Sequence, residues 1–249
     1  APAATRGVAV SVAGVASLRG MLHSEPPHIQ LYEYHTLGDL MQKVLVYSPS
    51  EFVTEAVQAV ANRTLSDIVF PISERALTPV EEVFPKAEGW LVSQFSLHRM
   101  KGRDVFFAVA AACPDVEFHG FDFHCSSDVQ HSANVVLRQF TTDTKPAFRA
   151  SRVVLIPSMV DETFCKVAFE ALEMGCIVVC SSQGNLPNIV TEDSGGVVVG
   201  SFLKEEWVQA MAMLLQETPA QLRGRAERAR ARAVQLRTQN LGRMREVLY

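Results

Sequence analysis

Short apolar runs alternate with helix-like segments along most of this chain of 249 residues. Most of the runs are rich in valine, isoleucine and phenylalanine, and several are apolar throughout. Strands of this composition are buried on both faces, as in a parallel sheet that helices cover. We therefore predict an α/β fold with strands that begin at Val44, Asp67, Trp90, Val116, Val135, Arg152, Cys176 and Gly196.

Between these runs, apolar residues recur at helical spacing. In the segment 48–63, Ser48 in the N-cap position, Pro49 directly after it and Glu51 three residues after the cap predict a helix start. Another helix is predicted from Glu162 to Gly175, because glycine suits the left-handed residue that ends a helix. The alternation predicts a Rossmann-like parallel sheet with helices on both faces.

The alternation is complete only from about residue 86 onward. Residues 86–249 are therefore predicted to form one Rossmann-like domain that ends in basic helices. Few predicted strands precede it, and a domain of typical size needs roughly a hundred residues or more. We expect residues 1–85 to be the C-terminal part of a second, partial Rossmann-like domain, with further chain upstream of Ala1.

Composition excludes some classes of function. The net charge of -4 argues against a general affinity for nucleic acid or anionic membranes. No apolar run approaches the ~18 residues of a membrane span, so we do not expect an integral membrane protein. Five cysteines, an odd number without metal-ligand spacing, predict reduced thiols in an intracellular, reducing compartment, cytoplasmic or organellar.

The C-terminal segment is strongly basic, with the sequence "RGRAERARARAVQLRTQNLGRMRE" from Arg223. It is either a solvated helix face or a contact surface for an acidic protein or an RNA partner. Both interpretations stay open at the level of sequence.

Two glutamates, Glu162 and Glu170, have seven residues between them. On one ideal helix they would lie about 12 Å apart along the axis and roughly 80° apart around it, too far to share one ion. If Glu162 lies in the loop before the helix, the two carboxylates can hold opposite ends of a long ligand such as a nucleotide diphosphate sugar. The alternative is a first-turn acid at Glu162 and a surface pair between Glu170 and Lys166.

The stretch "PSMVDETFCKVAFEALEMGCIVVCSSQGNLPNIVTEDSGGVVVG" contains several further elements around these glutamates. It resembles the donor-binding segment of retaining glycosyltransferases of the GT-B fold, family 4. The residues that carry the resemblance are Pro157, Ser158, Glu162, Glu170, Ala171, Gly175, Gly184 and Pro187, with Lys101 and Gly102 at the family's Lys-Gly position. The resemblance extends over roughly residues 40–249.

The resemblance implies transfer of a sugar from a nucleotide diphosphate sugar to an unknown acceptor, with retention and without a metal or cofactor. Glu170 would accept hydrogen bonds from the ribose hydroxyls. The catalytic candidates are Lys101, which would neutralise the diphosphate, and Glu162, which would accept from the transferred sugar. The other donor-binding candidates are Arg99, Thr163, Phe164, Cys165, Ser182, Gln183, Gly184 and Asn185.

Several positions depart from the family pattern. Ser93 and Gln94 stand where the family usually has Gly-Arg, and Thr163 and Cys165 replace two glycines near the donor site. These changes support an alternative hypothesis, a catalytically degenerate glycosyltransferase-like scaffold subunit of a large assembly, a ribonucleoprotein included. In that hypothesis the basic C-terminal helix docks the partner.

Histidines offer one further alternative. His119 and His124 in "EFHGFDFHC" suggest a metal site, but on one strand an odd separation would place them on opposite faces. A loop at the strand end over the donor site is the favoured interpretation, with no metal. His35 is read as a packed histidine or as an acceptor-side histidine.

Overall fold

A computed structural model of the chain describes residues 10–11, 46–48, 50–61, 67–68, 77–86 and 89–248. The chain divides into two compact units, one of residues 1–72 with 239–249 and one of residues 73–238. The predicted domain boundary between residues 85 and 86 stays a prediction.

The smaller unit contains a three-strand parallel sheet in the order β1-β2-β3. Its strands are β1 (Val10–Ser11), β2 (Val46–Ser48) and β3 (Asp67–Ile68), and its helix is α3 (Glu51–Ala61). The predicted N-cap at Ser48 is wrong, because Ser48 pairs with Ile68 in the sheet. The hydroxyl of Ser50 instead accepts a hydrogen bond from the amide of Val53, at 3.2 Å.

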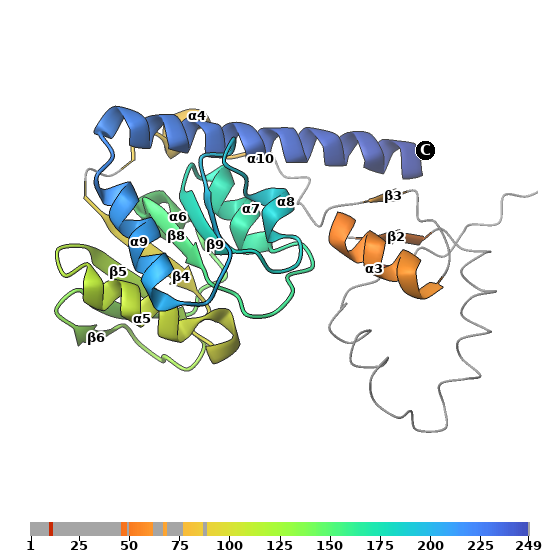
Figure 1. Cartoon of the computed structure of the whole chain (residues 1–249). Coiled ribbons are helices and arrows are strands. Elements are labelled where there is room, and N and C mark those ends of the chain that lie inside the picture. The colour runs from red at the N-terminus through yellow and green to blue at the C-terminus, as the bar shows by residue number, and fades with distance from the viewer. Residues whose placement is uncertain are drawn as a thin grey trace, which may run out of the picture. The chain divides into compact units, whose positions relative to one another are not determined.

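The larger unit is built on a seven-strand sheet in the order β10-β9-β8-β4-β5-β7-β6 (Figure 1). The strands are β4 (Leu91–Phe95), β5 (Glu117–Asp122), β6 (Val129–Ser132), β7 (Val135–Gln139), β8 (Val153–Ile156), β9 (Ile177–Ser181) and β10 (Val197–Val199). All neighbours are parallel except the edge strand β6, which is antiparallel to β7. The predicted α/β sheet is confirmed. Strand β6 was not predicted, because all its residues are exposed and it therefore lacks an apolar run.

Helices cover both faces of this sheet. They are α4 (Val80–Val83), the 3-10 turn η1 (Arg99–Lys101), α5 (Arg103–Ala112), α6 (Lys145–Ala150), α7 (Lys166–Glu173), α8 (Leu186–Ile189), α9 (Lys204–Leu215) and α10 (Pro219–Leu248). Residues of β4 at odd and even positions point to opposite faces. Val92 packs in one core cluster with Phe106 of α5 and Trp207 of α9. The ring of Phe95 faces the other way and lies 4.4 Å from that of Phe148 in α6.

Arginines near the start of α10 hold this helix to the sheet domain. The guanidinium of Arg225 pairs with the carboxylate of Glu217 at 2.6 Å. Arg230, which is buried, donates to the carbonyl oxygens of Glu173, at 2.7 Å, and of Thr78. Part of the basic character of the C-terminal segment therefore stabilises the fold itself. A protein or RNA partner on this helix stays a prediction.

Candidate functional site

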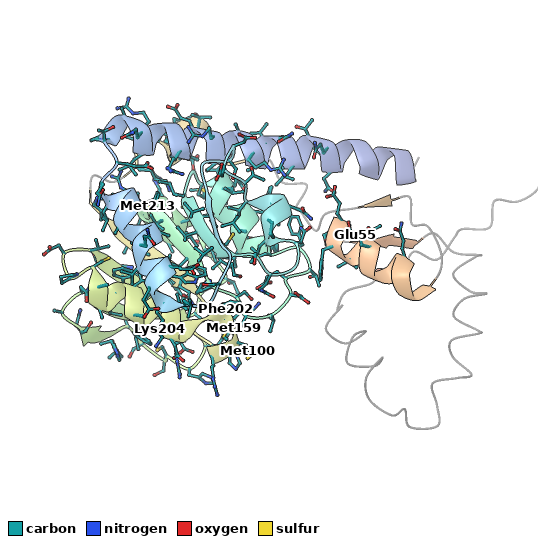
Figure 2. All side chains as sticks on the ribbon, in the orientation of Figure 1. Glu55, Met100, Met159, Phe202, Lys204 and Met213 are labelled. Atoms are coloured by element: carbon teal, nitrogen blue, oxygen red, sulfur yellow. The ribbon has the colours of Figure 1, made fainter. Side chains whose placement is uncertain are left out.

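The loops that follow the adjacent strands β4 and β8 meet at the carboxyl end of the sheet. The amide of Met159 donates to the carbonyl oxygen of Met100 at 2.9 Å, and both side chains are labelled in Figure 2. Gly102 has φ +77°, and a Cβ there would lie 2.2 Å from the carbonyl oxygen of Pro157. Only glycine fits this contact, which fixes the turn that carries Lys101 against the β8 loop.

An ion pair joins these two loops. The ammonium nitrogen of Lys101 lies 2.5 Å from Oε1 of Glu162, and the side chains are 36% and 14% exposed. The predicted helix start at Glu162 is wrong, since α7 begins at Lys166. Cys165 has φ +60°, a left-handed conformation that cannot continue a right-handed helix. Glu162 therefore lies in the loop before the helix, as the long-ligand interpretation requires.

The turn after β9 packs directly against Glu162. Gly184 has φ +58°, and a Cβ there would lie 2.3 Å from the carbonyl oxygen of Glu162. The amide of Asn185 donates to the same oxygen at 2.8 Å. Ser182 and Gln183 precede them in this turn, the first exposed and the second half-buried. The structure thus brings Gly184 and Asn185 against the backbone of Glu162, and the predicted contact of residues 182–185 with the sugar stays a prediction.

A cavity of about 140 Å³ lies between the end of β4, the η1 turn, the loop after β8 and the start of α7. Residues 182–185 of the turn after β9 are not among the residues that line it. Its polar lining includes Gln94, Lys101, Glu162, Cys165 and Lys166. Gln94 and Lys166 were not among the predicted site residues. A signal for Gln94 was present, because it is a large polar residue near the carboxyl end of a buried strand. Lys166 was considered only as a surface partner of Glu170.

Glu170 faces a different segment. Its Oε2 accepts a hydrogen bond of 3.3 Å from the hydroxyl of Thr144, just before α6. Burial raises the pKa of the Glu170 carboxyl, an effect that the positive charge of Lys166 partly offsets. Glu170 is not among the residues that line the cavity. Its predicted role at the ribose therefore needs a ligand that extends from the cavity toward Thr144, and it stays a prediction.

The remaining predicted residues occupy different surroundings. Phe164 is 2% exposed and its ring lies 6.2 Å from that of Phe169, so its side chain is part of the core and is not available to a ligand. Thr163 is half-buried in the same loop, and Arg99 is exposed on η1. Their contact with a donor stays a prediction.

Cys165 brings a thiol to the cavity wall. Burial, together with the nearby charge of Glu162, raises the pKa of Cys165 to about 12. The thiol is therefore protonated at neutral pH and is a poor nucleophile. It acts as a small neutral group that takes up space in the cavity.

The histidines form no metal site in the part of the chain that the structure describes. Nε2 of His119 lies 2.7 Å from Oε1 of Glu117 and 3.2 Å from the guanidinium of Arg138, and burial lowers the pKa of this imidazole. His124 follows the end of β5, where its amide donates to Asp122. Among the described residues, no three His, Cys, Asp or Glu side chains are grouped to hold a metal ion. His35 lies outside these residues.

None of the described helices combines the length and the apolar character needed to cross a membrane.

Comparison with known proteins identifies related sequences. A sequence model described as "Glycosyl transferases group 1" matches residues 83–217. The D-inositol 3-phosphate glycosyltransferase of Segniliparus rotundus is 41% identical over 86 residues, which are 34% of this chain and 19% of that protein. The enzyme of the same name from Corynebacterium aurimucosum is 33% identical over 75 residues, 30% of this chain and 18% of that protein. The matched stretches thus span less than a fifth of these relatives.

Similar solved structures cover more of the chain. HepE of Anabaena, crystallised with UDP and glucose, has a TM-score of 0.73 and 18% identity, and the match covers 97% of this chain and 71% of that one. A sucrose-phosphate synthase from Thermosynechococcus elongatus has a TM-score of 0.68 and 18% identity, covering 97% of this chain and 68% of that one. At such identities the likeness shows the fold alone.

Proposed function

Because this chain belongs to the group 1 glycosyltransferases and has the α/β fold of their GT-B structures, we propose that it binds a nucleotide diphosphate sugar and transfers the sugar with retention. In this proposal residues 86–249 are the donor-binding domain, and residues 1–85 are part of the neighbouring acceptor-side domain. The acceptor is not identified by these relationships.

The ion pair between Lys101 and Glu162 is the observation that carries the proposal. It places a cation and a strong hydrogen-bond acceptor 2.5 Å apart on one cavity wall. A ligand that carries phosphate next to hydroxyl groups can satisfy both, because an ammonium binds phosphate oxygens and a carboxylate accepts from hydroxyls. A nucleotide diphosphate sugar has this combination.

The start of α7 adds to the attraction for an anion. Cys165, Lys166 and Val167 at this helix start line the cavity, and no side chain caps the free amides. Unpaired helix amides and the helix dipole both favour negative charge.

These groups also suit the chemistry of transfer. Departure of the nucleoside diphosphate builds negative charge on its leaving oxygen, and a cation already in place lowers the cost of that charge. Lys101 supplies the cation, while Glu162 orients the sugar by accepting from its hydroxyls. We assign no protein nucleophile, and the protonated thiol of Cys165 is unsuited to that role.

Calorimetric titration with UDP, UDP-glucose, GDP and GDP-mannose tests the proposal. We expect micromolar binding of at least one of these, abolished by Lys101→Ala and weakened by Glu170→Ala. Lys204→Ala is the matched control, because Lys204 is an exposed lysine at the start of α9 and is not among the residues that line the cavity. A wild-type chain that binds none of these nucleotides would overturn the proposal.

A degenerate, scaffold-type relative is the second candidate. The cavity of about 140 Å³ is small. Typical small-molecule sites are about 300–1,000 Å³. The thiol of Cys165 occupies a position where a glycine would leave more room. Absence of binding to all four nucleotides, in a chain that melts cooperatively, would favour this candidate over the enzyme.

A further inference from the structure

Gln94 occupies an unusual place for a polar side chain. It is the fourth residue of β4, in the centre of the sheet, and is 1% exposed. It pairs in register with Gly120 of β5, and Gln94 is among the residues that line the cavity, as Lys101 is. A buried glutamine must satisfy both ends of its amide, or the unpaired end costs free energy.

One end of the Gln94 amide is firmly held. Nε2 donates to the carbonyl oxygen of Lys101 at 2.8 Å and reaches that of Ser96 at 3.5 Å. Both of these partners are acceptors, so the reversed amide would bring oxygen against oxygen. The orientation of the side chain is therefore determined, and Gln94 ties the Lys101 turn to the end of β4.

The other end of the amide is unsatisfied. Oε1 of Gln94 is buried and has no hydrogen-bond partner in the part of the chain that the structure describes. Glu162 supplies a second acceptor on the wall of the same cavity. A phosphate oxygen would meet lone pairs at both groups, whereas a hydroxyl can donate to either one.

We infer that Gln94 is a specificity-determining residue whose Oε1 accepts a hydrogen bond from a hydroxyl of the transferred sugar. This inference rests on the proposed donor binding and adds to it. Gln94 stands where the family usually has the arginine of a Gly-Arg pair, and in this inference it supplies a hydrogen-bond acceptor for the sugar. The diphosphate is left to Lys101, which Gln94 holds through its carbonyl oxygen.

The test compares UDP with UDP-glucose, and GDP with GDP-mannose, in calorimetric titrations. The measured quantity is the sugar increment, which is the Kd of the bare diphosphate divided by the Kd of its sugar conjugate. Gln94→Met removes both ends of the amide. Gln94→Lys removes the acceptor but keeps a donor for the carbonyl oxygens of Lys101 and Ser96. We expect both variants to lower the sugar increment about fivefold, the effect of one ordinary hydrogen bond.

Gln209→Met is the matched control, since Gln209 is exposed on α9 and does not line this cavity. It should leave the increment unchanged, and thermal melting should show that all three variants fold. If Gln94 only positions Lys101, Gln94→Met will weaken the binding of the diphosphate and of its sugar conjugate by the same factor, and the inference fails. An unchanged increment in Gln94→Lys, or a wild-type increment of one, also overturns it, while binding that depends on Lys101 would still support the proposed function. A wild-type chain that binds no nucleotide would contradict both the proposed function and this inference.

Discussion

The ammonium of Lys101 lies 2.5 Å from Oε1 of Glu162, although the two residues are 61 positions apart in the chain. Each side chain is held by a separate loop, the first by the Gly102 turn and the second by the turn at Gly184. Without a ligand the two charges neutralise one another. Any anion that binds Lys101 must therefore compete with the Glu162 carboxylate or share the ammonium with it.

This competition predicts an unusual effect of Glu162→Gln. The variant removes a negative charge beside the proposed phosphate site but keeps the size of the side chain. We expect the bare diphosphate, UDP or GDP, to bind on the order of threefold to tenfold more tightly, or about 0.7–1.4 kcal/mol. The sugar conjugate should gain less, because the strong carboxylate acceptor is lost. Titration calorimetry at constant ionic strength measures both.

Glu205→Gln is the control for a change in overall charge, since Glu205 is exposed on α9. It should leave both affinities as they are. Weaker binding of the diphosphate to Glu162→Gln would show that Glu162 supports the phosphate site instead of competing for it.

Gly184 should tolerate no side chain. An added Cβ would lie 2.3 Å from the carbonyl oxygen of Glu162, and φ of +58° disfavours any L residue. We expect Gly184→Ala to lower the melting temperature by roughly 4–8 °C, corresponding to about 2 kcal/mol, and to displace Glu162 from the cavity. Gly200→Ala serves for comparison, because nothing lies within 4 Å of its added Cβ. Equal melting temperatures for the two variants would contradict the packing described for the β9 turn.

Cys165→Gly should open the cavity at little cost in stability. Glycine relieves the left-handed strain at φ +60°, worth roughly 1–2 kcal/mol, but loses about 0.5–1 kcal/mol through greater freedom of the unfolded chain. We expect a melting temperature equal to or slightly above that of the wild type, together with tighter binding of UDP-glucose. Cys125→Gly, in the loop after β5, should not change this affinity. Unchanged binding to Cys165→Gly would mean that the thiol does not limit the site.

Glu170 should make stability depend on pH. Burial raises the pKa of its carboxyl above the ordinary 4.5, so the folded state holds this proton more tightly than the unfolded state does. The stability that this provides is present below pH 4.5 and is lost as the pH rises through the folded-state pKa. At pH 7 the buried charge is therefore a cost, and Glu170→Gln should raise the melting temperature by about 1–3 °C.

The higher melting temperature of Glu170→Gln should disappear below pH 4.5, where the wild-type carboxyl is neutral like the glutamine side chain. Glu192→Gln, at an exposed position, should show no such dependence. A lower melting temperature of Glu170→Gln at pH 7 would show that the bond from Thr144 and the charge of Lys166 outweigh burial. If Glu170 also binds the ribose, the variant will be more stable but will bind nucleotide more weakly, a common cost at functional positions.

Much of the fold of the larger unit could be predicted because its signals are local. Apolar runs marked the central strands, and Gly175 adopts φ +65° at the end of α7 as expected of a C-terminal cap. Local signals gave the wrong element boundary where contacts with other parts of the chain determined the structure. Ser48 has the features of an N-cap but pairs in β2, and the helix predicted from Glu162 starts only at Lys166.

The amino-acid sequence alone was therefore sufficient for the α/β class, for the positions of most buried strands along the chain and for Glu162 as a candidate site residue. Hydrophobic periodicity and backbone preference are properties of residues close together in the chain, so they can be recognised from the amino-acid sequence. Tertiary contacts alone establish that Glu162 pairs with Lys101, that Glu170 faces Thr144, and that Oε1 of Gln94 has no partner among the described residues. These relationships depend on which loops the pairing of β4, β8 and β9 brings together, and no local pattern encodes the distance between side chains so far apart in the chain.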